Sequence, residues 1–403
     1  MRVLFLSPRQ AWPVTSGAKL REYHLARGLA QHVQVTLLAF AEEKMRSSLP
    51  FLAEVLTVER PQRYTPLKLL RGLFGKEPVS LLNYRAPAMQ QALTELLSRT
   101  RFDIIQVEGT PMAAYRPLLE RSGARIVYDW HNIESELLHR YAASSPWPRS
   151  LYATLTARKL ERVEHAMLHS GAAHIVCSDR ERLQLKSLAP QAEVHTVPNG
   201  VDVAYFETAR ASATATPCRV LFVGSMDYHA NVEAAVEFAQ QIWPRLHAAY
   251  PRLRLTLLGA NPVPQVRNLA SLPGVEVTGT VPDLRPYYSE ALVSVVPLRT
   301  GGGTRLKILE AFAAGVPVVS TAVGAEGLDV VDGTDFLLAS SPDDWEAALR
   351  RLVEHPEVAR QLVQNGHDLV TRVYDWSSMS DQLLRIYQQL LSPSAPLQAL
   401  KHT

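Results

Sequence analysis

The sequence has very little cysteine, no long apolar run and almost no excess of one charge. Cys177 and Cys218 are its only cysteines, too few for a disulfide framework or a cysteine-based zinc site, which suits a reducing cytoplasm. No stretch approaches the roughly 20 apolar residues of a membrane span, and the apolar run before Pro8 is too short for a signal peptide. A net charge of +3 is too small to indicate a nucleic-acid-binding protein. We therefore expect a cytoplasmic protein that binds no nucleic acid.

What remains is the composition of an ordinary globular protein. Hydrophobic residues make up 47% of the chain and charged residues 20%, which excludes a disordered or fibrous protein. The length of 403 residues exceeds that of a typical single domain. It predicts two domains, each large enough to bury its own core.

Two similar apolar runs begin the two halves of the chain. "RVLFLS" (residues 2–7) and "RVLFVG" (219–224) are each followed by a loop and a helical pattern. Strands that alternate with helices predict an α/β fold with two Rossmann-like domains, in which ligands bind at the carboxyl ends of the strands. Further runs that read as buried strands span residues 33–40, 102–109, 124–130, 173–178, 253–259, 275–281, 291–298 and 316–321.

The domain boundaries follow from these runs and from one low-complexity stretch. "TARASATATP" (208–217) has no large apolar residue and reads as part of a linker. We expect an N-terminal domain at 1–198, a linker at 199–217 and a C-terminal domain at 218–375. We expect residues 376–403 to form a C-terminal helix that packs back on the N-terminal domain.

The stretch "GGGTRLKILEAFAAGVPVVST" (301–321) has the features of a phosphate-binding loop. Gly301, Gly302 and Gly303 have no Cβ and can bring backbone N–H groups against a ligand, while Thr304 leads into a helix whose N-terminus favours anions. Arg305 and Lys307 lie in the first turns, where a cation is unfavourable unless an anion is bound nearby. The alternative is a flexible glycine loop beside a solvated cationic face. Neither a P-loop nor a GxGxxG fingerprint is present.

This stretch resembles the donor-binding signature of family 4 of the retaining glycosyltransferases. That family has the GT-B fold, an α/β fold with two Rossmann-like domains facing a central cleft. Three more segments are similar to segments of the family, and the resemblance extends from residue 1 to about residue 390. The three are "YDWHNIESE" (128–136), "VPNGVDVAYF" (197–206) and "VGSMDYHANVEA" (223–234).

The resemblance implies roles for residues of the C-terminal domain in binding the sugar donor. Glu310 would hold the ribose of the nucleotide and belong to the catalytic group, and Arg305 and Lys307 would bind the diphosphate. Gly224 and Ser225 stand where the family commonly has Gly-Arg. Gly302 stands where the family often has a first glutamate, eight positions before Glu310. These departures shift the neutralisation of phosphate onto Arg305 and Lys307.

The resemblance also implies roles for residues of the N-terminal domain. Gly17 would offer backbone N–H groups to the same phosphates. His131, which follows the expected strand at 124–130, would face the donor sugar as a catalytic residue; the alternative is a structural histidine bonded to backbone. Asp129 and Glu134 flank it and are second choices.

The implied reaction moves a sugar from a nucleotide-diphosphate sugar to an acceptor hydroxyl with retention at the anomeric carbon, in polysaccharide or glycolipid synthesis. It needs no cofactor, and we expect no metal, since no Asp-x-Asp motif stands at a strand end. Preorganised donors and two cations can stabilise the leaving diphosphate. Two alternatives stay open, namely a sugar-nucleotide 2-epimerase of the same fold and a non-catalytic nucleotide-sugar-binding protein.

The acceptor is expected to be a saccharide or a lipid-linked saccharide. Residues 60–78, "RPQRYTPLKLLRGLFGKEP", alternate basic with large apolar residues, which fits a segment lying on an anionic bilayer at the inner face of the membrane. The alternative is an ordinary helix whose leucines pack inward while its cations face water.

Overall fold

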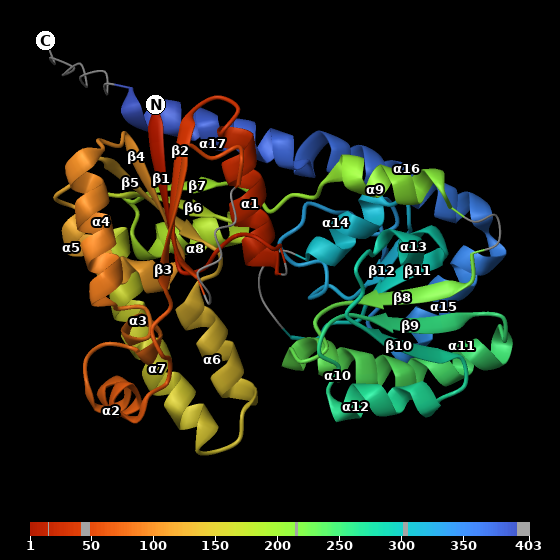
Figure 1. Ribbon diagram of the computed structural model, residues 1–403. Coiled ribbons are helices and arrows are strands. Elements are labelled where there is room, and N and C mark those ends of the chain that lie inside the picture. Colours follow the sequence, from red (N-terminus) through yellow and green to blue (C-terminus); the bar gives the residue numbers. More distant parts are fainter. Residues whose placement is uncertain (15, 42–48, 214–216, 301–304, 393–403) are drawn as a thin grey trace, which may run out of the picture. The chain divides into compact units, whose positions relative to one another are not determined.

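The computed structural model describes residues 1–14, 16–41, 49–213, 217–300 and 305–392. The chain divides into two compact units (Figure 1). The N-terminal unit comprises Met1–Val197 with Ser380–Thr403, and the C-terminal unit comprises Pro198–Met379. The domain boundaries drawn from the sequence stay a prediction.

The N-terminal unit is built on a seven-stranded parallel sheet in the order β3-β2-β1-β4-β5-β6-β7. Its central strands are buried on both faces, as expected for apolar runs enclosed by crossover helices. The strands are β1 Arg2–Ser7, β2 Gln34–Ala41, β3 Glu54–Glu59, β4 Ile104–Glu108, β5 Arg125–Trp130, β6 Ala173–Val176 and β7 Glu193–Thr196. The helices are α1 Gly17–Leu29, α2 Pro66–Phe74, α3 Val79–Leu82, α4 Pro87–Arg99, η1 Thr110–Tyr115, α5 Arg116–Leu119, α6 Glu134–Ser144, α7 Arg149–Leu168 and α8 Asp179–Leu188.

The C-terminal unit repeats this architecture with six parallel strands in the order β10-β9-β8-β11-β12-β13. Its strands are β8 Arg219–Val223, β9 Arg254–Leu258, β10 Val275–Gly279, β11 Ala291–Val296, β12 Val318–Ser320 and β13 Leu337–Leu338. Its helices are α9 Val203–Ala211, α10 His229–Glu237, η2 Phe238–Ile242, α11 Trp243–Ala249, α12 Pro264–Arg267, η3 Asn268–Ser271, α13 Arg285–Ser289, α14 Leu306–Ala313, α15 Pro342–Glu354, α16 Pro356–Leu369 and η4 Val370–Tyr374.

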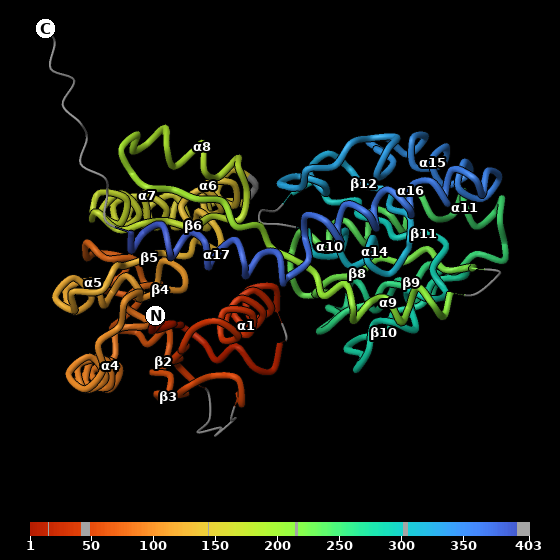
Figure 2. The backbone as a smooth tube through the Cα atoms, turned by 90° about the horizontal axis from the view of Figure 1, so that it is seen from above, coloured from red at the N-terminus to blue at the C-terminus, as the bar shows by residue number. Residues whose placement is uncertain are grey.

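Helix α17 (Trp376–Leu391) starts among residues of the C-terminal unit and ends among residues of the N-terminal unit (Figure 2). Within the N-terminal unit, the hydroxyl of Tyr387 donates a hydrogen bond to Gln106 Oε1 on β4. Helices α1 and α17 approach closely, since a Cβ on Gly28 would lie 2.1 Å from Ser380 Oγ. The last turns of α17 therefore complete the N-terminal unit.

The α/β fold with two Rossmann-like units is as the sequence predicts. Each expected strand is formed, whereas β3, β7 and β13 were not expected. Residues 203–211 of the expected linker form α9, whose Phe206 and Ala209 pack into the core of the C-terminal unit. Among the described residues, no helix is long and apolar enough to cross a membrane.

The strand order identifies one candidate ligand position in each unit. It reverses between β1 and β4 in the N-terminal unit and between β8 and β11 in the C-terminal unit. Ligands of doubly wound sheets bind beside the carboxyl ends of the strands at such points. Ser7 and Glu108 end β1 and β4, and Val223 and Val296 end β8 and β11.

Candidate active site

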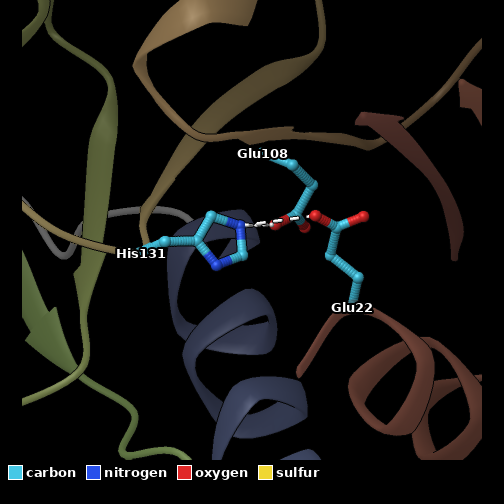
Figure 3. Close-up of side chains that lie close together, drawn as sticks. All are labelled: Glu22, Glu108 and His131. Carbon is cyan, nitrogen blue, oxygen red and sulfur yellow. Dashed lines mark hydrogen bonds and ion pairs between the residues drawn. The ribbon is translucent and has the colours of Figure 1, made fainter. Parts of the chain in front are cut away.

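In the N-terminal unit, two glutamates converge on His131 (Figure 3). His131 follows β5, Glu108 is the last residue of β4, and Glu22 lies on α1. His131 Nε2 lies 3.0 Å from Glu108 Oε2 and 3.5 Å from Glu22 Oε1. Both glutamate side chains are buried, and the histidine side chain is 10% exposed. The sequence predicted His131 for this site but neither glutamate.

Burial controls the protonation of this group. Burial raises the pKa of Glu22 and of Glu108, and the nearby carboxylate of Asp129 raises the pKa of Glu108 further. Burial lowers the pKa of His131, and this effect exceeds the opposite effect of the negative charges of Asp129 and Glu22, which raise it. Two neighbouring carboxyl groups with raised pKa values beside a neutral imidazole form a site that can hold one proton.

Asp129, a second choice from the sequence, has a structural partner. Its carboxylate accepts from Arg21 Nε at 2.9 and 3.1 Å, and Arg21 also donates to the carbonyl of Val197 at 2.8 Å. Both charged side chains are almost fully buried, so the pair compensates its own charge. Glu134, the other second choice, begins α6, where burial and the neighbouring Glu164 raise its pKa.

Glu22, Glu108 and His131 are also the residues that could hold a metal ion. One potential ligand atom from each lies within 4.8 Å of the other two, and the described residues contain no other such group. Arg9 Nε lies 3.6 Å from Glu22 Oε1, and this positive charge opposes a bound cation. The expectation of no metal stays a prediction.

In the C-terminal unit, helix α14 and its N-cap residue carry three of the predicted donor-binding side chains, namely Arg305, Lys307 and Glu310. Arg305 is the N-cap residue of α14, is buried, and donates from Nη2 to the carbonyl of Val323 at 3.4 Å. Lys307 Nζ donates to Asn231 Oδ1 at 3.0 Å and lies 4.8 Å from the centre of the Phe222 ring. Gly301, Gly302, Gly303 and Thr304 lie outside the described residues.

Lys307 is a half-buried cation in an environment that disfavours its charge. Burial and the adjacent Arg305 lower the pKa of Lys307 to about 7. Among the described residues, Lys307 forms no ion pair within 4.0 Å. Its Nζ points to the first helix after β8, at the switch point of the sheet. A half-buried amine of this kind gains from a bound anion.

Asn231 connects the predicted residues of two separate segments. Its Oδ1 accepts from Lys307, and its Nδ2 donates to the carbonyl of Ser225 at 2.9 Å. A Cβ on Gly224 would lie 2.7 Å from Asn231 Nδ2, so only glycine fits there without a shift. Gly224, Ser225 and Lys307 are thereby brought together. The sequence did not indicate Asn231.

Glu310 lies one helical turn beyond Lys307 and faces a buried tyrosine. The hydroxyl of Tyr288 donates to Glu310 Oε2 at 3.2 Å, and burial raises the pKa of Glu310. In the N-terminal unit, Gly17 is the first residue of α1, so its N–H is one of the donors without a partner inside the helix. The binding and catalytic roles of these residues stay predictions.

Two family models match separate parts of the chain. The model described as Glycosyltransferase Family 4 matches residues 15–205, and the model described as Glycosyl transferases group 1 matches residues 217–355. Together they cover most of both units.

Curated relatives share about a quarter of their residues with the matched part of this chain. The glycogen synthase of Mycobacterium tuberculosis is 24% identical over 242 residues, which are 57% of each chain. The phosphatidyl-myo-inositol mannosyltransferase of the same organism is 27% identical over 263 residues, which are 61% of this chain and 67% of the mannosyltransferase. The chain thus spans little more than half the length of the glycogen synthase that it matches.

Solved structures resemble the chain over nearly its whole length. The sucrose-phosphate synthase from Thermosynechococcus elongatus has a TM-score of 0.74 at 20% identity and covers 97% of this chain and 99% of its own. The Anabaena protein HepE, crystallised with UDP-glucose, has a TM-score of 0.67 at 14% identity and covers 96% of this chain and all of its own. These likenesses show the GT-B fold. The chain belongs to glycosyltransferase family 4, the glycosyl transferases group 1.

Proposed function

We propose that the protein is a retaining, metal-independent glycosyltransferase that moves a sugar from a nucleotide-diphosphate sugar to an acceptor hydroxyl. The observation that carries the proposal is Lys307, a half-buried amine without an ion-pair partner among the described residues, at the topological switch point of the C-terminal sheet. An esterified diphosphate supplies the missing negative charge. Arg305, the N-cap residue of the same helix, adds a second cation.

The chemistry follows from where charge develops. When the bond from the anomeric carbon to the diphosphate oxygen breaks, negative charge grows on the leaving diphosphate. Arg305 and Lys307 stabilise that charge more strongly than the charge of the intact donor. Glu310 accepts hydrogen bonds from ribose hydroxyls, and His131 contacts the transferred sugar.

Several relatives support this proposal. HepE was crystallised with UDP-glucose, a nucleotide sugar. The curated relatives include a glycogen synthase and a lipid mannosyltransferase, whose products are a polysaccharide and a glycolipid. We place this protein in the same broad group of pathways and leave the sugar and the nucleobase open.

A 2-epimerase of the same fold is a second candidate, and one observation favours it. Such an enzyme needs acidic and histidine groups packed around its substrate, and Glu22, Glu108 and His131 form such a group. The two activities differ in product. An epimerase converts the nucleotide sugar without releasing a nucleoside diphosphate, whereas a transferase releases one for each sugar transferred.

A thermal-shift screen of UDP, GDP, dTDP and their sugars tests the donor site. A ligand at 100 times its dissociation constant adds about 2.7 kcal/mol of stability. In the variants Arg305→Ala and Lys307→Ala we expect the affinity for the stabilising nucleotide sugar to fall by about one to two powers of ten. Glu310→Gln raises the Michaelis constant for the donor, because a neutral amide accepts hydrogen bonds less strongly. Wild-type affinity in both cation variants would place the diphosphate elsewhere.

We also propose that the N-terminal unit docks on an anionic membrane through helix α2 and the tip of the α6–α7 hairpin. The inward-packing alternative for α2 is wrong, because Leu67, Leu69, Leu70 and Leu73 are all exposed and only Gly72 is buried. Phe74 is 81% exposed. Helices rarely present such an apolar surface to water without a binding partner.

The α6–α7 hairpin extends this surface. Lys159 of α7 donates to the carbonyls of Gly72 and Leu73, which fixes α2 against α7. At the tip of the hairpin, Trp147 is 79% exposed, and Leu151 and Tyr152 are exposed as well. Aromatic and leucine side chains of this kind enter the interfacial region of a bilayer.

Basic residues around α2 supply the preference for anionic lipid. Arg71 and Lys76 are exposed, and Lys68 is partly exposed. Arg60 is not available, since it donates to the carbonyl of Pro8 and to Tyr84. Each exposed cation near an anionic surface contributes about 1 kcal/mol. A lipid-linked acceptor is consistent with such a docking surface.

Vesicle sedimentation tests the docking proposal. The wild type should pellet with vesicles of phosphatidylglycerol but not with neutral phosphatidylcholine, and binding should fall at high salt. The triple change of Lys68, Arg71 and Lys76 to Glu should abolish it. A matched control changes Arg245, Arg350 and Arg360 of the C-terminal unit to Glu, with the same change in net charge. Equal partitioning of the two triple variants would reject docking through α2.

A further inference from the structure

The carboxyl groups beside His131 are connected to a chain of buried hydrogen bonds. Gln106 Nε2 donates to Glu108 Oε1 at 2.6 Å and lies 3.4 Å from Asp129 Oδ2. A side-chain amide nitrogen can only donate, so Gln106 turns its nitrogen toward the two carboxyl groups and its oxygen toward α17. There the hydroxyl of Tyr387 donates to Gln106 Oε1. The orientation of Gln106 is thereby fixed from both ends.

Ser7 indicates which carboxyl group carries a proton. Ser7 Oγ lies 2.6 Å from Glu22 Oε2 and 2.7 Å from the carbonyl oxygen of Arg9. A hydroxyl has a single hydrogen, so Ser7 can donate to only one of these oxygens. Both short contacts are hydrogen bonds when Glu22 is protonated and donates to Ser7, while Ser7 donates to the carbonyl of Arg9.

Charge balance indicates that one carboxyl group of this cluster is protonated, and the contacts of Ser7 assign that proton to Glu22. The buried group contains the carboxyl groups of Glu22, Glu108 and Asp129, and the cations beside them are Arg21 and Arg9. With one carboxyl group protonated and His131 neutral, the net charge is zero. A net charge of −1 in this buried space would be costly.

We propose that Glu22 stores a proton and that Glu108 is an ionised positioning residue, which holds His131 as the Nε2–H tautomer and leaves Nδ1 as a hydrogen-bond acceptor. Glu108 Oε2 then accepts from His131 Nε2–H. Nδ1 points away from both glutamates (Figure 3) and has no hydrogen-bond partner among the described residues. The ligand chemistry that fits a neutral acceptor is a hydroxyl group, such as that of a sugar. This inference rests on the proposed function only for the identity of that hydroxyl.

Nitrogen-15 NMR of histidine-labelled protein tests the tautomer without any activity measurement. The signal of His131 is assigned from its loss in His131→Gln. In the wild type at pH 7 we expect a protonated Nε2 and an unprotonated Nδ1. In Glu108→Gln, Gln106 still donates to the new amide oxygen, so the new amide NH2 faces His131 Nε2. The tautomer should then change to Nδ1–H.

Glu22→Gln is the matched control, because its amide can donate to Ser7 as the protonated carboxyl group does. This variant should keep the wild-type tautomer. Infrared spectroscopy should show a protonated-carboxyl C=O band in the wild type that is lost in Glu22→Gln.

Three results would overturn the proposal. The first is a wild-type His131 protonated at Nδ1, and the second is a carboxyl band that persists in Glu22→Gln. The third is a His131 signal that shifts on chelation or on addition of Zn²⁺, which would make the three residues a metal site. None of these results bears on whether the protein transfers sugar, so the two proposals fail separately.

Discussion

At the scale of single residues, Lys307 is a half-buried cation whose charge depends on pH near neutrality. Burial lowers its pKa to about 7 in the free protein, whereas an adjacent diphosphate ester favours the charged form. The free protein loses this proton as pH rises through 7, so donor affinity should fall. We expect about tenfold weaker binding at pH 8 than at pH 6, measured by isothermal titration calorimetry with the nucleotide sugar that stabilises the protein most.

Two substitutions separate this effect from general changes in charge. Lys307→Met should lower the affinity and remove its dependence on pH between 6 and 8. Lys186→Met, at a lysine of the N-terminal unit whose Nζ donates to the backbone carbonyls of Pro190 and Ala192, should preserve both. An affinity of the wild type that stays constant across this range would mean that Lys307 does not bind the diphosphate.

At the scale of elements, helix α14 depends on a close approach of α16. A Cβ on Gly366 of α16 would lie 2.6 Å from the Phe312 ring of α14. Gly366→Val therefore overpacks this contact and should lower the free energy of unfolding by about 1–3 kcal/mol. Urea unfolding measures the change.

The control for this prediction is Gln364→Val, which places the same side chain at an exposed position of α16. It should cost only about 0.5 kcal/mol in helix propensity. Helix propensity alone favours Val over Gly at position 366. A Gly366→Val variant as stable as the wild type would therefore show that the contact with Phe312 leaves room for the larger side chain.

Local sequence patterns were sufficient for most of the elements. Buried central strands read as continuous apolar runs. The helix that contains Lys307 was indicated by the cations that follow a glycine loop. β3 and β7 were missed because they lie at the edges of the sheet and are only partly buried. β13 has two residues, too few for a pattern.

The partners of the predicted residues were harder to find, because they come from distant parts of the chain. Glu108 did leave a signal, a carboxylate at the end of the apolar run 102–109. Glu22 left none, since a glutamate on a helix normally faces water. Asn231 is 76 residues from Lys307 in sequence. It reaches Lys307 because α10 packs beside β8.

At the scale of the whole molecule, the two units should respond to pH in opposite directions. The pKa values of Glu22 and Glu108 in the folded protein are raised above the unfolded value near 4.5. The stability that these two groups contribute is fully present below pH 4.5 and is lost as pH rises through their folded pKa values. The lowered pKa of Lys307 makes the C-terminal unit more stable as pH rises from about 7 toward 10.5. Calorimetry between pH 5.5 and 9 should show one component weakening and one strengthening.

The variants assign these components. Glu22→Gln should reduce the loss of stability that the N-terminal unit shows as pH rises. Lys307→Met should remove the gain of stability that the C-terminal unit shows over the same range. Parallel shifts of both components in each variant would contradict an assignment to separate units.

The central proposal is sugar transfer with retention, and proton NMR of the first product formed tests it most directly. The protein is mixed with an α-configured nucleotide sugar from the screen, without acceptor, so that water takes the sugar. Retention predicts that the α anomer of the free sugar appears first, together with one nucleoside diphosphate, and at a rate about 10 to 100 times lower in Lys307→Ala. The β anomer appearing first, or a converted nucleotide sugar without release of nucleoside diphosphate, would contradict it.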